Sequence, residues 1–277
     1  MPVRIVQSKQ NARLKQLRRA LVRPVRDARG TVGIEGPHLL GEAMRAGLCI
    51  QCVFAAHGAE NLLRPLNLAP DIEVLLVPRE LLGAFLATES PQPIAALVEP
   101  PDWTWAHFFS IHSKAPSLVV LLAGIQDPGN LGTIVRSAEA FGADGVLSLP
   151  GTVHAWNPKA VRASAGSVFR VPLLETTFAE AFLHLRQAGA KIHAATIHAA
   201  EPADLVDLAG PVALLIGNEG NGIHPELAAQ ADAAITIPCP GQVESLNAAV
   251  AASVLLYEAA RQRSFRGGPL EHLGGPR

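Results

Sequence analysis

The chain has too few cysteines for a disulfide framework, and their number is odd. It contains three in 277 residues, whereas disulfide-stapled domains carry an even, closely spaced set. Cys49 and Cys52 form a CxxC pair, but the pair lies in the apolar run LCIQCVFAA, and no second Cys or His pair follows at zinc spacing. The ten histidines form no HExxH group. We therefore expect core cysteines and no metal site.

Hydrophobic runs long enough to span a membrane are also absent. The most apolar stretch, residues 248–256, is interrupted by Ser253 and followed by Glu258, and it is shorter than the roughly 20 residues that cross a bilayer. No secretory leader opens the chain. With 49% hydrophobic and 17% charged residues, the composition is typical of a compact globular protein. We expect a soluble, cytoplasmic protein with no membrane partner.

Two widespread nucleotide-binding motifs are missing. No GxGxxG stands in the first strand-to-helix turn of the second half, and no GxxxxGK[ST] occurs anywhere in the chain. These glycine-rich motifs hold the phosphates of dinucleotides and of nucleoside triphosphates. We therefore expect neither a dinucleotide-binding Rossmann enzyme nor a P-loop NTPase.

Excess positive charge is confined to the N-terminus. The whole chain carries −1, but residues 1–30 hold nine Lys or Arg against Asp27, a net +8 that leaves −9 on the other 247 residues. Concentrated positive charge favours phosphate binding. Leu14, Leu17 and Leu21 recur at helical spacing, so a solvated helix face is the alternative. Both interpretations hold if the leucines dock on a domain and the arginines face outward.

Apolar runs alternating with helical patterns predict a small α/β domain in residues 1–98. Residues 99–116 contain three prolines and no clean period, which predicts a linker. Its aromatic cluster of Trp103, Trp105, Phe108 and Phe109 is expected to dock on a domain, with base stacking as the alternative. The expected strands are 31–35, 50–55, 72–77 and 94–98, and the expected helices are 37–46, 61–66 and 79–87.

From residue 117 strands and helices alternate again, which predicts a parallel sheet with helices on both faces. The expected strands are 118–123, 145–149, 191–196, 212–217 and 233–238. Helix starts are marked by Asn130, by Asn157 before Pro158, by the Thr177 and Glu180 capping box, and by Pro225.

The closing helix, from Ser245 to about Arg261, is apolar almost all round between Leu246 and Tyr257. Such a helix is expected to be buried on every side, either in the core or between two subunits. Residues 263–277 contain four glycines and two prolines and are expected to be disordered.

A polar turn follows the first expected strand of the second domain, in the segment GIQDPGNLGTIVRSAEAFGADGVL at 124–147. Asn130 is expected as the N-cap of the next helix and Gly142 as its C-terminal stop. Its expected outer face holds Gly132, Thr133, Arg136 and Glu139. Ligands of open α/β sheets bind at the carboxyl ends of strands, so Asn130 and Arg136 are candidate site residues. The alternative is an ordinary loop with a solvated arginine.

Two further segments end a strand in a glycine-containing turn with small polar residues. Residues 212–223, VALLIGNEGNGI, place Asn218 and Glu219 in such a turn. Residues 235–258, ITIPCPGQVESLNAAVAASVLLYE, place Glu244, Ser245 and Asn247 at the opening of the closing helix. Glycines let a ligand approach the backbone, while amide and hydroxyl groups orient it. The three strand ends therefore predict one binding site.

These three segments resemble the signature motifs of the SpoU (TrmH) family of RNA ribose 2′-O-methyltransferases. The segment NPKAVRASAGSVFRVPL at 157–173 is also similar to that family. IEGPHLLGEAMRAG at 34–47 resembles the substrate-binding domain of many members. The resemblance implies an α/β fold with an N-terminal RNA-binding domain (1–98), a linker (99–116) and a SPOUT-type parallel-sheet domain (117–262). It also implies a trefoil knot, which is a rare exception to unknotted topology.

The resemblance further implies S-adenosylmethionine as cofactor, RNA as partner with ribosomal RNA favoured, and a homodimer through the C-terminal domain. It matches the catalytic positions of the family to Arg136, Asn130, Glu219, Ser245 and Asn247. Positions that hold the methyl donor match Gly217, Ile237 and Leu246, and Gly222 in the same turn as Gly217 is assigned with them. From the basic segment we expect RNA contacts by Arg13, Arg18, Arg19 and Arg23.

A ribose 2′-hydroxyl is a weak nucleophile at neutral pH, whereas a sulfonium methyl group is a strong electrophile. Holding the two in line can supply about 7–11 kcal/mol, without a metal or a covalent intermediate. The family's arginine is often regarded as the base, but a guanidinium hardly deprotonates in proteins. We therefore favour Arg136 as a clamp on a phosphate or on the developing alkoxide.

Three alternatives stay open at this point. The chain could methylate transfer RNA, or it could be an RNA-binding homologue that has lost catalysis, although Asn130, Arg136, Ser245 and Asn247 are all present. It could also be a transferase for an unrelated small substrate, against which the basic N-terminal segment argues.

Overall fold

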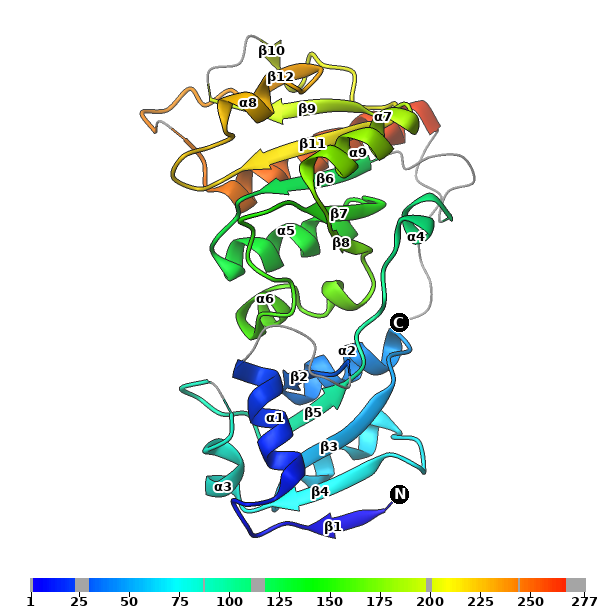
Figure 1. Cartoon of the computed structure of the whole chain (residues 1–277), viewed down its shortest axis with the longest axis vertical. Coiled ribbons are helices and arrows are strands. Elements are labelled where there is room, and N and C mark those ends of the chain that lie inside the picture. The colour runs from blue at the N-terminus through cyan, green and yellow to red at the C-terminus, as the bar shows by residue number, and fades with distance from the viewer. Residues whose placement is uncertain are drawn as a thin grey trace. The chain divides into compact units, whose positions relative to one another are not determined.

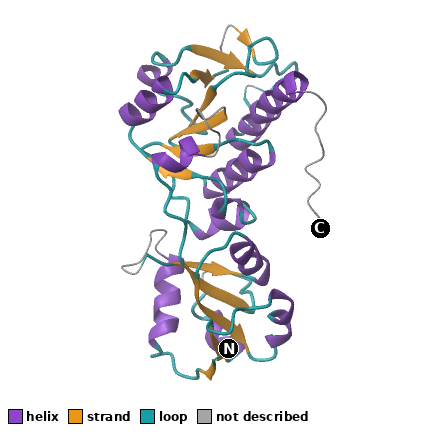
Figure 2. Ribbon diagram, turned by 90° about the vertical axis from the view of Figure 1, so that its right-hand side faces the viewer, coloured by secondary structure: helices purple, strands orange, loops and turns teal. Residues whose placement is uncertain are grey.

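The computed structural model describes residues 2–22, 30–86, 88–110, 118–197, 201–243 and 245–267. The chain forms two compact units, which Figures 1 and 2 show together. Unit 1 consists of residues 1–102 and 154–170, and unit 2 consists of residues 103–153 and 171–277. Residues 154–170, within the predicted 117–262 domain, thus group with unit 1.

Unit 1 is built on a mixed sheet with the strand order β1-β4-β3-β5-β2. β1, β4 and β3 run parallel, whereas β5 is antiparallel to β3 and to β2. The four predicted strands are confirmed, and the short, exposed β1 was not predicted. The strands are β1 (Val3–Ile5), β2 (Val32–Glu35), β3 (Ile50–Ala56), β4 (Glu73–Val77) and β5 (Ile94–Val98).

Helices cover this sheet in unit 1. They are α1 (Ala12–Val22), α2 (Pro37–Arg45), α3 (Arg79–Gly83) and α6 (Pro158–Ala163), with the 3₁₀ turns η1 (Glu60–Leu62), η2 (Arg64–Leu66) and η3 (Ser167–Phe169). The predicted helix over 61–66 is wrong, because two 3₁₀ turns replace it. Pro65 lacks the N–H group that a continuous helix would need there. The core position predicted for the cysteines is confirmed for Cys52 and wrong for Cys49, which is exposed.

Unit 2 is built on a sheet with the strand order β10-β12-β9-β11-β6-β7-β8, in which every pair is parallel. β6 and β11 are buried along almost their whole length, as the continuous apolar runs LVVLLA and VALLIG require. The five predicted strands are confirmed, and the short β8 and β10 were not predicted. The strands are β6 (Leu118–Ala123), β7 (Gly145–Ser148), β8 (Leu173–Glu175), β9 (Lys191–Ala195), β10 (Glu201–Pro202), β11 (Val212–Gly217) and β12 (Ala233–Thr236).

Helices lie on both faces of this sheet, as predicted (Figure 1). α5 (Pro128–Ala140) and α9 (Ala248–Gly267) pack against each other on one face. On the other face, α4 (Trp105–Ser110), α7 (Phe178–Gln187) and α8 (Pro225–Ala228) contribute to an apolar core with alternate side chains of the strands. α4 lies within the predicted linker, where Phe108 is fully buried and the Trp105 ring stacks 4.2 Å from His184. The predicted docking of the aromatic cluster is therefore confirmed for these two residues.

The observed helix α9 begins and ends at other residues than the predicted closing helix. It begins at Ala248 and continues to Gly267, so the predicted disorder of 263–267 is wrong. Arg263 extends back to donate a hydrogen bond to the Gly210 carbonyl at 2.9 Å. Residues 268–277, the rest of that predicted tail, lie outside the described residues.

Within a single chain, α9 is not buried on every side as the sequence predicted. Leu255, Leu256 and Ala259 are buried, but Val250, Val254 and Tyr257 are 48%, 40% and 55% exposed. One stripe of the helix packs on unit 2, and a second apolar stripe is left open. Among the described residues, no helix combines the length and apolar character needed to cross a membrane.

Candidate functional site

The carboxyl ends of the parallel strands in unit 2 lie along one edge of the sheet, and the strand order reverses between β6 and β11. From β6 the chain adds β7 and β8 on one side, whereas β11, β9 and β12 lie on the other side of β6. The loops that leave β6 and β11 therefore diverge from neighbouring strands, and ligands of open α/β sheets bind at such a point. All three predicted motif segments contribute residues near these strand ends.

The loop after β6 ends in a helix cap that differs from the prediction. Asp127, not Asn130, is the N-cap of α5, and its carboxylate accepts a hydrogen bond from the Asn130 backbone N–H at 2.9 Å. Pro128 follows as the first helical residue, a position where its missing N–H costs nothing. Gly132 is buried and not on the outer face as predicted, and Gly142, with φ +70°, ends the helix as predicted. The corrected cap leaves the Asn130 side chain free for other partners.

The loop after β11 brings Glu219 to this helix start. One carboxylate oxygen of Glu219 accepts from the Asn130 side-chain amide at 2.9 Å and from the Asp127 N–H at 3.2 Å, and the other accepts from the Gln126 N–H at 3.3 Å. Burial raises the pKa of the Glu219 carboxyl, but hydrogen bonds from the Asn130 amide and from backbone N–H groups outweigh it and hold this pKa below its usual range. Glu219 is therefore a carboxylate at neutral pH.

Asn247 joins the same cluster from the start of α9. Its side-chain amide donates to the Asn130 side-chain oxygen at 3.0 Å. Its own side-chain oxygen caps α9 by accepting from the N–H groups of Ala249 and Val250 at 2.9 and 3.3 Å. Glu219, Asn130 and Asn247 thus form a chain of hydrogen bonds that links all three predicted segments.

Arg136 and Ser245 lie outside this chain of bonds. Arg136 is exposed on α5, about 9 Å along the helix axis from Asn130, and has no hydrogen bond or ion pair within the described part of the chain. Ser245 is exposed and lines the neighbouring pocket. The structure therefore brings together three of the five predicted catalytic residues, places Ser245 in the neighbouring pocket and leaves Arg136 further along α5 without a contact to them.

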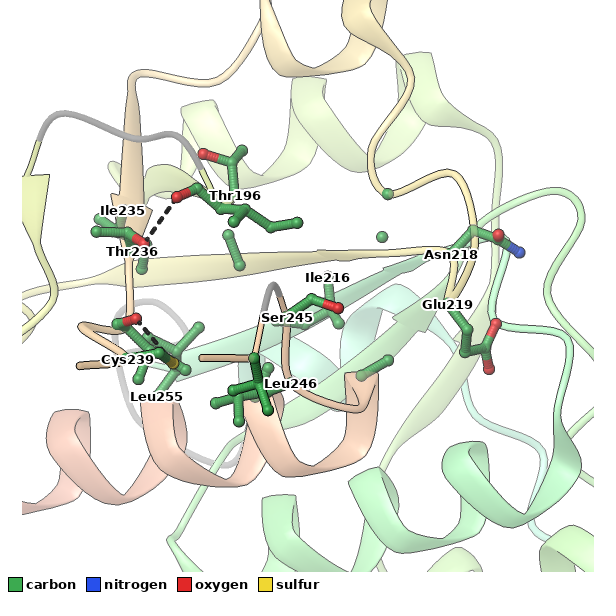
Figure 3. A pocket seen from close by; sticks show the side chains of 18 of the residues that line it. Thr196, Ile216, Asn218, Glu219, Ile235, Thr236, Cys239, Ser245, Leu246 and Leu255 are labelled. Atoms are coloured by element: carbon green, nitrogen blue, oxygen red, sulfur yellow. Dashed lines mark hydrogen bonds between the residues drawn. The ribbon is translucent and has the colours of Figure 1, made fainter. Parts of the chain in front are cut away.

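A pocket of about 520 Å³ opens beside the cluster, at the carboxyl ends of β9, β11 and β12 and under the start of α9 (Figure 3). Asn218 and Glu219 lie at one end of it, Thr236 and Cys239 lie at the other, and Leu246 lies between them beside α9. The pocket is lined by all four residues predicted to hold a cofactor, Gly217, Gly222, Ile237 and Leu246.

Gly217 and Gly222 are favoured at their positions in the pocket for different structural reasons. A Cβ atom on Gly217 would lie 2.4 Å from the backbone carbon of Gly222 and 2.5 Å from the Ile223 nitrogen, so the turn has no room for it. Gly222 has φ +66° and open space around the Cβ position, so only its backbone conformation favours glycine. The turn closes through two backbone hydrogen bonds of 2.9 Å between Asn218 and Gly222.

Several pocket residues were given no site role from the sequence, although Asn218 was recognised as part of the glycine-containing turn. Asn218 accepts from the N–H groups of Gly220 and Asn221 and donates to the Gly124 carbonyl at 2.8 Å, which joins the loops after β11 and β6. Thr196 and Thr236 line the pocket at the ends of β9 and β12. The same rule that singled out polar residues at strand ends could have found the two threonines. Among the described residues, no group of three or more His, Cys, Asp and Glu side chains is placed to hold a metal ion.

Three of the four predicted RNA-binding residues, Arg13, Arg18 and Arg19, belong to α1 of unit 1. Leu14, Leu17 and Leu21 are buried, whereas Arg18 and Arg19 are exposed, so the predicted docked and outward faces of this helix are confirmed. Arg18 donates to the Ala84 carbonyl at 2.6 Å. Arg13 is held closer to the domain, with its Nε atom 3.5 Å from the Glu73 carboxylate. Arg23 lies outside the described residues.

Comparison with known proteins finds a family match for each of the two main parts of the chain. The profile of the SpoU rRNA Methylase family matches residues 117–257, and that of the MRM3-like substrate binding domain matches residues 11–96. A curated relative, the 23S rRNA (guanosine(2553)-2′-O)-methyltransferase RlmP of Bacillus subtilis, is 31% identical over 91% of this chain and 97% of its own length.

Two solved structures are similar over nearly the whole chain. The SpoU methyltransferase AviRb from Streptomyces viridochromogenes in complex with AdoMet has a TM-score of 0.79 at 29% identity and covers 92% of this chain and 98% of its own. The AdoMet-bound rRNA methyltransferase from Sinorhizobium meliloti has a TM-score of 0.80 at 30% identity, with 94% and 98% covered. With one family profile spanning half of its length and a 31% identical relative aligned over 91% of it, the chain belongs to the SpoU rRNA methylase family.

Proposed function

We propose that this protein transfers the methyl group of S-adenosylmethionine to a ribose 2′-hydroxyl of ribosomal RNA. The observation that carries the proposal is the hydrogen-bonded chain of Glu219, Asn130 and Asn247 at the edge of a pocket lined by Gly217 and Leu246. The relative RlmP is a 23S rRNA 2′-O-methyltransferase, and two structural neighbours are solved with AdoMet. Transfer RNA is the alternative substrate.

The pocket suits S-adenosylmethionine in size and in charge. Its volume of about 520 Å³ lies within the range of about 300–1,000 Å³ typical of cofactor sites. Ile216, Ile235 and Leu255 supply apolar walls, whereas Glu219 places a carboxylate at one end, where it complements a cation. We assign Gly217, Gly222, Ile237 and Leu246 to holding the cofactor.

The cofactor, when bound, supplies a methyl group already activated on a sulfonium. The task left to the protein is to hold the 2′-hydroxyl in line with it and to favour loss of the hydroxyl proton. Glu219 orients the Asn130 amide, and Asn247 holds the other end of that amide. Arg136, with no hydrogen-bond partner among the described residues, is available to bind a phosphate or the developing alkoxide. Ser245 lies in the pocket within the same segment as Asn247 and completes the substrate side.

The proposal is tested by incubating the purified protein with S-adenosylmethionine carrying a labelled methyl group and with separate pools of 23S rRNA, 16S rRNA and tRNA. Label is expected in one ribosomal RNA, at a single ribose that blocks primer extension at low nucleotide concentration. Label in tRNA alone would transfer the proposal to the alternative substrate. Binding of the cofactor with no labelled RNA in any pool would favour an inactive homologue.

We further propose that the chain is divided into an RNA-binding domain (1–98), a linker (99–116) and a methyltransferase domain (117–262), and that the protein acts in the cytoplasm, where rRNA-modifying enzymes work.

We also propose that the protein is a homodimer that associates through α9. The exposed apolar stripe of Val250, Val254 and Tyr257 supports an α9 interface, since large exposed apolar patches mark interaction sites. Light scattering of the purified protein is expected to give twice the chain mass of 29.1 kDa. A Val254→Glu substitution should reduce it to one chain, and a monomeric wild-type protein would refute the interface.

The basic helix α1 yields a prediction about salt. If its outward arginines contact phosphates, RNA affinity should fall with salt with a log–log slope of about −0.7 per neutralised phosphate of a single strand. Replacing Arg18, Arg19 and Arg23 by Ala should make that slope shallower by about 2 and raise the RNA KM. The measurement is a titration of labelled RNA at several salt concentrations.

The controls for this prediction come from the same unit. Leu14, Leu17 and Leu21 keep α1 docked in the triple variant, so the fold should be retained. Arg64→Ala, which removes one exposed positive charge outside α1, should leave the slope unchanged. An unchanged slope in the triple variant would make α1 a solvated helix face and place the RNA surface elsewhere.

A further inference from the structure

The loop that follows β7 lies directly against the loop that carries Asp127 and Asn130. The Thr152 hydroxyl accepts a hydrogen bond from the Gly124 N–H at 3.0 Å and donates one to the Leu122 carbonyl at 2.9 Å. The next residue, Val153, donates its N–H to the Ile125 carbonyl at 2.8 Å. A single side chain thus joins the end of strand β6 to the first residue of the loop.

Gly124 is the residue at which this loop turns, and both of its polar groups have partners. Its N–H is bound by Thr152 and its carbonyl by the Asn218 side chain at 2.8 Å. Its φ of +76° lies in the left-handed region, which few other residues adopt. Two and three residues later, the N–H groups of Gln126 and Asp127 point to Glu219. The direction of the Gly124 peptide therefore determines where the loop meets Glu219.

We propose that Thr152 is a positioning residue for methyl transfer, because its hydroxyl holds the Gly124 peptide and thereby the loop that presents Asn130. The proposal rests on the proposed function. Thr152 does not line the cofactor pocket, whereas Asn218, the other partner of Gly124, does. Loss of the Thr152 hydroxyl leaves the Gly124 N–H and the Leu122 carbonyl without this partner, but leaves the pocket wall unchanged. Its effect should appear in the rate of transfer and not in cofactor binding.

The test compares Thr152→Val, which keeps the shape of the side chain and removes the hydroxyl, with Thr152→Ser, which restores it. A displacement of a reacting group by about 1 Å costs on the order of 100-fold in rate, so the Val variant should lose about 10- to 100-fold in kcat. The RNA KM and the S-adenosylmethionine Kd should stay within about twofold, as expected when only transition-state interactions are lost. The Ser variant should recover most of the rate.

A matched control separates positioning from stability. Thr177→Val removes the N-cap hydroxyl of α7, which accepts from the Glu180 N–H at 3.3 Å and does not touch the Gly124 loop. Loss of a cap lowers stability by about 0.5–2 kcal/mol, so the Tm should fall while kcat at 25 °C stays that of the wild type. An unchanged kcat in Thr152→Val, or a Ser variant as slow as the Val variant, would overturn the proposal.

Hydrogen exchange of the Gly124 amide gives a readout that needs no RNA. Exchange should be faster in Thr152→Val than in the wild type and normal in Thr152→Ser, and equal exchange in all three would overturn the proposal. If the wild type methylates no RNA, the proposed function fails, while the exchange data still decide whether the Thr152 hydroxyl holds the Gly124 peptide. Should the Val variant not fold, Thr152→Ala provides the same measurements with a smaller side chain.

Discussion

Arg136→Ala is expected to abolish detectable methyl transfer while leaving the affinity for S-adenosylmethionine within a few-fold of the wild type. Arg136 does not line the cofactor pocket, and the structure gives its guanidinium no partner among the described residues. Loss of one preorganised donor to a developing oxyanion costs about 100- to 1,000-fold in kcat, and loss of a phosphate clamp would add a rise in RNA KM. Single-turnover transfer with saturating cofactor measures the first effect, and calorimetry measures cofactor affinity.

Two further variants distinguish a clamp from a mere positive charge. Arg136→Lys keeps the charge but loses the planar fork that binds phosphate or carboxylate through two hydrogen bonds, so it should recover only a small part of the rate. Lys191→Ala removes an exposed charge at the amino end of β9, opposite to the site, and should behave like the wild type. Substantial turnover by Arg136→Ala would remove Arg136 from the mechanism.

The architecture could be predicted because the strands of unit 2 carry unambiguous patterns. β6 and β11 are continuous apolar runs, a pattern of strands buried on both faces of a parallel sheet, and each is followed by a glycine-containing polar turn. Asn130, Glu219 and Asn247 were placed at one site because carboxyl ends of parallel strands share one edge. The short strands β8 and β10 were missed because two or three residues carry no period.

Competition between two residues for the N-cap position of α5 explains why the cap was predicted wrongly. Asn130 and Asp127 are both good N-cap residues, and Asp127 is selected because Pro128 directly behind it is suited to the first helical position. The role proposed for Thr152 could not be inferred from the sequence, since its hydroxyl bonds to Gly124 and to Leu122 of β6, which lie 28 and 30 positions earlier. The trefoil knot implied by the family resemblance stays a prediction.

Substitution of Gly217 is the other prediction with a large effect, and the structure selects between two possible reasons for it. In a glycine-containing turn at a strand end, a side chain at Gly217 would either fill the cofactor slot or block the turn. The Cβ atom would meet the backbone of Gly222 at 2.4 to 2.6 Å, a separation that real Cβ contacts do not show. The obstacle is therefore the turn itself, which would have to open and break the paired hydrogen bonds between Asn218 and Gly222.

Gly217→Val is accordingly expected to weaken S-adenosylmethionine binding by at least about 100-fold, roughly 2.7 kcal/mol, and to abolish transfer. Gly222→Ala, strained only by its positive φ, should cost about 1 kcal/mol and bind the cofactor with a modest loss. Gly210→Val, where the Cβ meets nothing within 4 Å, should be neutral. Calorimetric titration with S-adenosylmethionine ranks the three variants by their affinity for the cofactor, and circular dichroism checks that each is folded. A folded Gly217→Val protein with wild-type affinity would show that this turn does not form the cofactor site, because no arrangement of it retains both the Val side chain and the Asn218–Gly222 pairing.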